Sequence, residues 1–91
     1  MIAMLCRNRV ADFEEWKAVF DAQTDACRAA GLRLRNLWRN VEDPNNVFFL
    51  FEVESVDKAR AFISDPEAAD VGAASGVLDG ECHFLSGGEG R

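Results

Sequence analysis

The chain has 91 residues and a mass of 10.1 kDa, which is the size of one small domain. Its net charge of −6, with 16 acidic against 10 basic residues, argues against binding to nucleic acid or anionic membranes, because both need an excess of Lys and Arg. No apolar run approaches the roughly 20 residues of a membrane span, and the first residues lack the basic-then-apolar order of a signal peptide. We therefore expect a soluble, cytoplasmic, single-domain protein with no nucleic-acid or membrane partner.

The first third of the chain predicts a strand followed by an amphipathic helix. Residues 2–9 alternate in hydropathy as strands do. Asp12 stands three residues before Glu15, which is the spacing of a capping box, and apolar side chains then recur at helical intervals. We expect this helix over 13–30, with Gly31 in the position where a glycine ends many helices.

The middle of the chain predicts a β-hairpin. Residues 32–41 favour a second strand, although the apolar alternation breaks near Asn36 and indicates a bulge or twist. Residues 42–46 contain one proline and two asparagines, which is typical of a turn. The third strand, 47–54, is apolar on both of its faces, and a strand of this kind belongs in the middle of a covered sheet.

The last third of the chain predicts a helix in two parts and a final strand. Ser55 caps the helix, and the pair Asp65-Pro66 restarts it, since Asp is a good N-cap and Pro suits a first helical turn. The restarted helix extends to about residue 74, and residues 80–85 form the last strand. The order β-α-β-β-α-β is that of an α+β, ferredoxin-like domain with an antiparallel sheet.

One face of this sheet is left uncovered by the helices of the chain. We expect a single ferredoxin-like domain over residues 1–86 and a disordered tail at 87–91. Such a domain consists of one sheet and one layer of helices, so no part of it is expected to cover the second face of the sheet. A second copy would cover it, and burying about 700 Å² of apolar surface per subunit is worth on the order of 15 kcal/mol before association costs. We therefore predict a homodimer whose two sheets pack face to face.

Short motifs along nearly the whole chain, about residues 3–85, are similar to those of a known superfamily. They are mainly caps, turns and core positions, namely Asp12–Lys17 with Phe20 and Asp21, Gly31, Trp38 and Arg39 before Asp43–Asn45, Phe51–Ser55, Ala59–Phe62 and Ser64–Pro66. Together they resemble the dimeric α+β barrel superfamily, in its antibiotic-biosynthesis-monooxygenase-like branch. The resemblance implies a sheet-to-sheet dimer with a ligand pocket between the sheet and the helices of each subunit.

Members of this superfamily differ widely in chemistry. They include cofactor-free quinone-forming monooxygenases, haem-degrading monooxygenases, muconolactone isomerases, polyketide cyclases and many proteins of unknown activity. Haem-degrading members use an Asn, a Trp and a His, but Asn8, Trp38 and His83 do not match their pattern of positions. The resemblance therefore does not imply that this chain binds haem, and we expect no cofactor.

His83 is the single histidine of the chain and the candidate catalytic residue, because histidine is the residue type that exchanges protons most readily near neutral pH. Asn8 or Arg39 would help it to steer protons. A hydrogen-bonded structural histidine is the alternative. Because His83 alternates with its two neighbours along a strand, the catalytic interpretation requires its side chain to face the helices, near cavity space shared with Trp38 or Asn8.

Four side chains are candidates for ligand binding, namely Asn8, Trp16, Trp38 and Arg39. The two tryptophans could form the walls of a pocket for a small aromatic or apolar ligand, and an arginine could pair with a carboxylate or phenolate. Core packing is the alternative for Trp16, because it lies on the apolar stripe of its helix. Ion pairing at the rim of the domain is the alternative for the arginines.

Two classes of function remain open. The first is a cofactor-independent monooxygenase, cyclase or isomerase that acts on a small, flat, mostly apolar molecule. The second is a non-catalytic dimeric module that binds a ligand or fills its cavity with its own Phe and Trp side chains. The cavity distinguishes them, because an open pocket of a few hundred Å³ with polar groups at its walls favours the enzyme.

The cysteines predict a reducing compartment. Cys6, Cys27 and Cys82 are odd in number, widely spaced and without a CxxC pair. A zinc site would need closer cysteine pairs and more histidines. We therefore expect three unlinked thiols and no metal.

Overall fold

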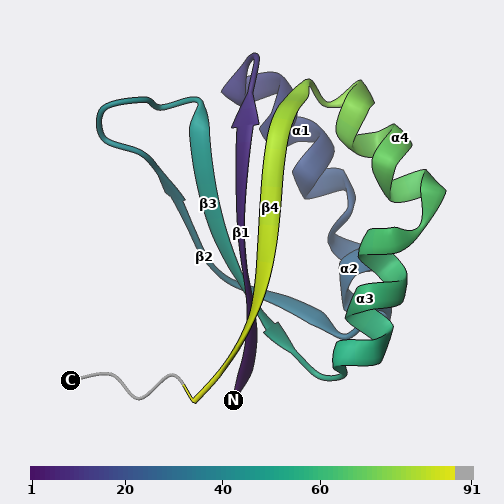
Figure 1. Ribbon diagram of the computed structural model, residues 1–91. Helices are drawn as coiled ribbons and strands as arrows, with labels where there is room; N and C mark the ends of the chain where they lie inside the picture. Colours follow the sequence, from purple (N-terminus) through teal and green to yellow (C-terminus); the bar gives the residue numbers. More distant parts are fainter. Residues whose placement is uncertain (88–91) are drawn as a thin grey trace.

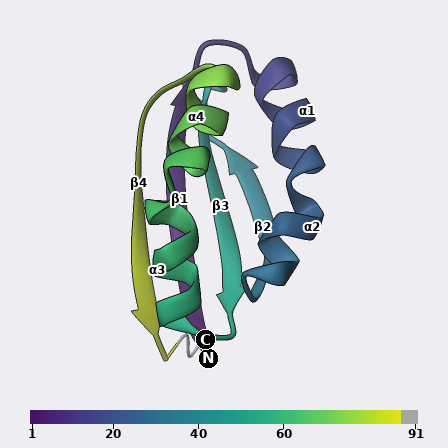
Figure 2. The same ribbon diagram turned by 90° about the vertical axis from the view of Figure 1, so that its right-hand side faces the viewer.

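The computed structural model describes residues 1–87, and within them the chain forms four strands and four helices. Their order is β1 (Ile2–Val10), α1 (Phe13–Ala22), α2 (Thr24–Ala29), β2 (Leu32–Arg39), β3 (Asn46–Val53), α3 (Val56–Ser64), α4 (Pro66–Ala74) and β4 (Val77–Ser86). The strands form one antiparallel sheet in the order β2-β3-β1-β4, and these helices lie on one face of it (Figures 1 and 2). The predicted α+β, ferredoxin-like fold is confirmed. Gly87 apart, the tail expected at 87–91 lies outside the described residues.

The helices begin at the capping residues that the sequence indicated. The side chain of Asp12 accepts a hydrogen bond from the backbone N–H of Glu15 at 3.0 Å, and Ser55 accepts one from Lys58 at 3.3 Å. Asp65 accepts from the backbone N–H of Glu67 at 2.8 Å and starts α4. Each bond satisfies a backbone donor that has no partner inside its helix. None of the helices in residues 1–87 has the length and apolar character that crossing a membrane requires.

The single helix expected over 13–30 is two helices, α1 and α2, and the prediction of one continuous helix is wrong. The break falls at Gln23, whose backbone N–H bonds to the carbonyl of Phe20 only three residues earlier. The hydroxyl of Thr24 donates to the carbonyl of Asp21 at 2.7 Å and competes with the regular helical ladder. Gly31 ends α2 as expected, with a φ of 76° that favours glycine.

The strands agree with the expected ones apart from their ends. The register between β2 and β3 shifts between Leu34 and Asn36, so the predicted irregularity near Asn36 is confirmed. Strand β2 ends at Arg39. The side-chain oxygen of Asn40 then accepts hydrogen bonds from the backbone N–H groups of Glu42 and Asp43, which starts the turn. Strand β4 begins at Val77, three residues before the expected start, and continues the pairing with β1.

The hydrophobic core lies between the sheet and the helices. Trp16 of α1 is buried and stacks on Phe20 with 4.6 Å between the ring centroids. Phe49 and Phe51 of β3 extend this aromatic cluster from the sheet side, at 5.7 Å from Trp16 and 6.1 Å from Phe20 respectively. The alternate side chains of β3, which include Leu50, point to the other face, so this strand carries apolar groups on both faces as predicted.

The expectation of three unlinked thiols is wrong. A disulfide joins Cys6 of β1 to Cys82 of β4, and the third cysteine, Cys27, is free. The two linked residues are 76 positions apart, but the antiparallel register sets them directly opposite each other with 4.1 Å between their Cα atoms. Sequence spacing carries no information about this register, and for that reason the pair was not foreseen.

Candidate functional site

The alternation of side chains along the strands divides the predicted site residues between two faces of the sheet. Asn8 shares the helix-facing side with Cys6, which is part of the core. His83 lies between two residues that face the helices, so its own side chain points to the opposite, open face. Trp38 is opposite Phe48 on that same open face and is 47% exposed. The structure therefore separates His83 and Trp38 from Asn8.

A cavity of about 480 Å³ lies between the sheet and the helices, and we call it the helix-side cavity. Two of the predicted ligand residues, Asn8 and Trp16, line it. Its walls are mostly apolar, and the further polar side chains are those of Gln23 and Ser75. Ser75 is buried, and its hydroxyl donates to the carbonyl of Gly72 at 2.9 Å.

The small side chains of α4 leave room for this cavity. Ala68, Ala69 and Gly72 line it from above, and a Cβ atom at Gly72 would meet nothing within 4 Å. Helix α4 is therefore held over β4 without filling the space beneath it. In the sequence, the Ala-rich and weakly amphipathic pattern of α4 corresponds to this loose packing.

Gly80 allows Asn8 to take its position over β4. A Cβ atom at Gly80 would clash with Oδ1 of Asn8 and would lie 2.8 Å from the carbonyl oxygen of Arg7. The two residues are directly opposite each other in the β1–β4 ladder. Sequence reasoning did not single out Gly80, although a glycine inside a strand often marks a close approach of another group.

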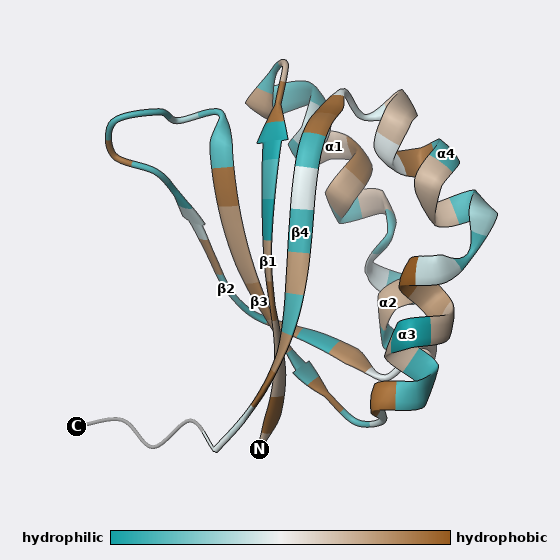
Figure 3. Ribbon diagram, viewed as in Figure 1, coloured by the Kyte–Doolittle hydropathy of each residue, from teal (hydrophilic) through white to brown (hydrophobic). Residues whose placement is uncertain are grey.

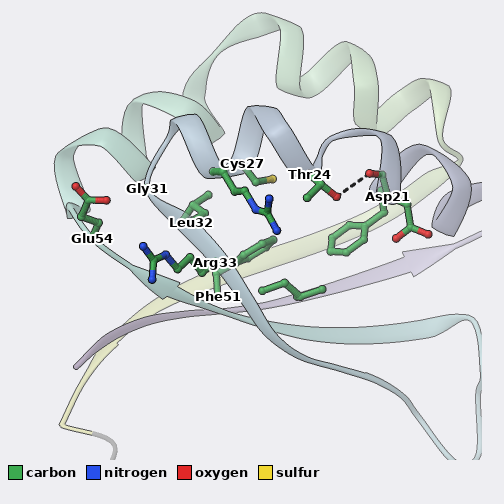
Figure 4. A pocket seen from close by; sticks show the side chains of 11 residues that line it. Asp21, Thr24, Cys27, Gly31, Leu32, Arg33, Phe51 and Glu54 are labelled. Carbon is green, nitrogen blue, oxygen red and sulfur yellow. Dashed lines mark hydrogen bonds between the residues drawn. The ribbon is translucent and has the colours of Figure 1, made fainter.

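A second cavity, of about 660 Å³, opens at the edge of the sheet between β2 and the α1–α2 segment (Figure 4). It carries side chains of both charges, with Arg33 and Glu54 near one end and Asp21 at the other. Four residues line both cavities, namely Phe20, Cys27, Leu32 and Phe51. Although it is larger, this edge cavity contains neither Asn8 nor Trp16, and the helix-side cavity fits the expected position better.

Arg39 reaches neither cavity. Its guanidinium lies 3.8 Å from the centroid of the Phe13 ring, where a cation is attracted by the ring face. Its Nε donates to the carbonyl of Pro44 at 2.9 Å and ties the end of β2 to the hairpin turn. These contacts give Arg39 a structural role at the top of the sheet.

The open face carries a network of ion pairs between β1 and β4. Arg7 pairs with Asp79 at 2.8 Å and with Glu81 at 3.2 Å, and Arg9 pairs with Asp79 at 2.7 Å. Hydrogen bonds from Arg7 and then Arg9 hold the pKa of Asp79 below its ordinary value. The pKa of Glu81 is lowered by its bonds to His83, at 2.6 Å, and to Arg7.

This network defines the surroundings of His83. Its side chain is 57% exposed, it bonds to Glu81, and it does not line the helix-side cavity. The condition for a catalytic role, a helix-facing position near Asn8 or Trp38, is therefore not met. In the same residues, 1–87, no three His, Cys, Asp or Glu side chains cluster as metal ligands would.

Comparison with known proteins adds information on the fold. No protein-family model matches the sequence, and no curated protein matches it. A variant of SnoaB, a cofactor-independent oxygenase from Streptomyces nogalater, superposes on 98% of this chain and 94% of its own, with a TM-score of 0.74 and 15% identity. A provisionally assigned antibiotic biosynthesis monooxygenase from Bordetella bronchiseptica covers 94% of this chain and 95% of its own, with a TM-score of 0.75 and 16% identity.

A third solved structure agrees with these two. It is a provisionally assigned antibiotic biosynthesis monooxygenase from Caulobacter crescentus CB15, which is 19% identical over 97% of this chain and 90% of its own, with a TM-score of 0.72. Identities this low establish a common fold and do not transfer an activity. The chain therefore shares its fold with these solved structures, two of which are provisionally assigned antibiotic biosynthesis monooxygenases, and this is the fold that its motifs indicated.

Proposed function

We propose that this protein is a homodimeric, cofactor-independent monooxygenase that oxidises a small, flat, mostly apolar phenol in the helix-side cavity. The observation that carries the proposal is the cavity itself, with a volume of about 480 Å³, apolar walls and the amide of Asn8. This volume is in the range of ligand sites, and such a lining suits an aromatic ring with one or two polar substituents. The oxygenase with the same fold supports the choice of reaction.

The lining of the cavity favours oxidation over isomerisation or cyclisation. Isomerases and cyclases move protons between positions of the bound substrate and need a general base in the cavity, whereas no charged side chain lines it within residues 1–87. Oxidation needs one proton loss, from the phenol to water, and the phenolate can then give electrons to O₂ directly. The balanced reaction turns a phenol and O₂ into a quinone and water, with one oxygen atom entering the ring at a C–H position. The amide N–H groups of Asn8 and Gln23 would hold the phenolate oxygen by hydrogen bonds.

The same observation supports a second candidate, a ligand-binding module without turnover. A cavity wall without charged groups can hold an apolar molecule and leave it unchanged. The aromatic cluster of Trp16, Phe20 and Phe49 would then serve only to shape the cavity. The two candidates share the ligand class and differ in whether oxygen is consumed.

The test uses the purified protein and a panel of phenols with two and three fused rings. Binding is followed by the quenching of tryptophan fluorescence, since Trp16 lines the cavity. Oxygen uptake and quinone absorbance are followed in parallel. If the protein is a monooxygenase, we expect saturable uptake of one O₂ per quinone formed, without an added cofactor. Binding without uptake would support the second candidate, and neither binding nor uptake would contradict both.

Two variants on opposite faces of the sheet locate the reaction. Asn8→Ala removes the amide from the cavity wall and slightly enlarges the cavity, and we expect it to reduce turnover at least tenfold because the hydrogen bond to the phenolate is lost. His83→Ala changes the open face, and we expect turnover to stay within twofold of wild type. A tenfold loss in His83→Ala, which general acid–base catalysis would produce, would contradict the placement of the reaction in the helix-side cavity.

The homodimer in this proposal rests on the open face of the sheet. Trp38 and Leu85 are both close to half exposed there, beside the apolar side chains of Leu5, Phe48 and Leu50. In Figure 3, β1 is hydrophobic near the N-terminus and hydrophilic toward its other end. A second copy related by a two-fold axis would cover the apolar part and leave the helix-side cavity of each subunit open.

A further inference from the structure

The disulfide between Cys6 and Cys82 forms part of the wall of the helix-side cavity. Both cysteines line this cavity, and they link the central strand β1 to the edge strand β4. Nothing in the proposed oxidation of a phenol uses them.

The two linked cysteines differ in solvent exposure. Cys6 is 1% exposed and has Phe49 as its direct neighbour on the other side, in β3. Cys82 is exposed and lies in β4, the last strand of the sheet in the described part of the chain. In thiol–disulfide exchange, a thiolate attacks one sulfur from the side opposite to the other. Phe49 lies on the side from which such an attack on Cys6 would come, whereas Cys82 is in an edge strand with no further strand beyond it in residues 1–87.

The cavity provides space for the attacking molecule beside Cys82. Its volume of about 480 Å³ suits a small molecule, and the small side chains of α4 keep the space over β4 free. Asn8 and Gln23 offer amide groups that would bond to the peptide groups of a thiol such as glutathione, whose charged ends would stay in water outside the cavity because no charged side chain lines it within residues 1–87. A protein thiol on a rigid surface would not enter a cavity of this size.

We propose that Cys82 is a thiol-exchange site that accepts a low-molecular-weight thiol through the helix-side cavity. The thiolate forms a new S–S bond to Sγ of Cys82, the Cys6–Cys82 bond breaks, and Cys6 leaves as a thiolate that takes a proton from water. A second thiol can then attack the mixed disulfide, which releases the oxidised small-molecule disulfide and leaves both cysteines reduced. The site does not depend on the proposed oxygenase activity.

Cys27 does not compete for this role. It lines the same cavity, but burial raises the pKa of its thiol, so less of it is ionised at neutral pH. Since the thiolate is the nucleophile, Cys27 reacts slowly with disulfides. Replacing it by serine therefore gives a background in which only Cys6 and Cys82 are measured.

The first experiment compares two matched variants in this background. Cys6→Ser leaves the Cys82 thiol alone, and Cys82→Ser leaves the Cys6 thiol alone, so neither variant can form the disulfide. Each is treated with oxidised glutathione, and the mixed disulfide is followed by intact mass. We expect Cys82 to react at least tenfold faster than Cys6. Equal rates, or reaction of either thiol only after unfolding by urea, would overturn the proposal.

The second experiment uses the chain with its disulfide intact and tests the role of the cavity. Reduced glutathione is added, the reaction is stopped with acid, and peptide mapping is expected to find the adduct on Cys82 and a free thiol at Cys6. Gly72→Leu fills the cavity and is expected to slow the exchange at least fivefold. Ala61→Leu adds the same side chain at an exposed position of α3 away from the cavity and is the control. An adduct on Cys6, or equal rates in both variants, would contradict the proposal.

Discussion

At the scale of single residues, Gly80 controls the wall of the helix-side cavity. A Cβ atom there would clash with the side chain of Asn8 and lie 2.8 Å from the carbonyl oxygen of Arg7, which is fixed in its strand. We predict that Gly80→Ala lowers the free energy of unfolding by about 1–3 kcal/mol, as overpacking does. Urea denaturation measures this loss, and the amide resonances of Asn8 are expected to shift.

Gly72→Ala is the matched control for this prediction. The substitution is the same, but Gly72 lies in helix α4 and a Cβ atom there meets nothing within 4 Å. Alanine is favoured over glycine inside a helix, so this variant is expected to be more stable by about 0.5–1 kcal/mol. If both variants were equally stable, the close packing of Asn8 over Gly80 would be excluded.

The disulfide gives a second prediction at this scale. Protein denatured without a reductant is expected to show one reactive thiol per chain, that of Cys27, and three after reduction. A titration with a chromogenic disulfide reagent counts them. Three thiols before reduction in air-oxidised protein would show that Cys6 and Cys82 do not pair.

At the scale of elements, β1 and β4 are joined by an ion-pair network that depends on pH. Hydrogen bonds from Arg7 and Arg9 lower the pKa of Asp79, whose ordinary value in an unfolded chain is about 3.9. Because the carboxyl pKa is lower in the folded protein, the ion pairs of Asp79 contribute fully to the free energy of unfolding above about pH 4. This contribution is lost as the pH falls through the pKa of Asp79 in the folded state. We predict an NMR titration midpoint for Asp79 below 3.9.

Two substitutions identify the source of this shift. Arg7→Gln removes the first partner of Asp79, so the midpoint of the carboxyl is expected to move up toward its ordinary value. Arg33→Gln makes the same change in β2, away from this network, and is expected to leave the midpoint unchanged. An unchanged midpoint in Arg7→Gln would contradict the assigned cause.

The elements themselves were largely predictable because their signals are local. Asp12, Ser55 and Asp65 cap helices through bonds to residues two or three positions away, so a short stretch of sequence contains both partners. The break at Gln23 is also local, but the sequence did not reveal it. A threonine such as Thr24 can either face solvent or bond back to its helix, and the apolar pattern is the same in both cases.

At the scale of the whole molecule, the division of residues between the two sheet faces was not predictable. Alternation shows that His83 opposes its neighbours in β4, but it does not say which face is covered by helices. The register with β1 decides this, because it places Cys82 opposite the buried Cys6 and His83 opposite Leu5. Asn8 reaches the cavity because it shares the face of Cys6, and Trp38 does not because the β2–β3 register places it opposite Phe48 on the open face. Trp16 reaches the cavity from helix α1.

The two faces are expected to have separate tasks, with assembly on the open face and the ligand on the helix face. Wild-type protein should sediment at about twice 10.1 kDa. Leu50→Lys places a charge on the open face, opposite Leu5, and should give a folded monomer that still binds the phenol probe. Val41→Lys, at a residue of the hairpin turn that is 97% exposed, is the matched control and should remain dimeric. A monomeric wild type would exclude the dimer, and a dimeric Leu50→Lys would place the interface elsewhere.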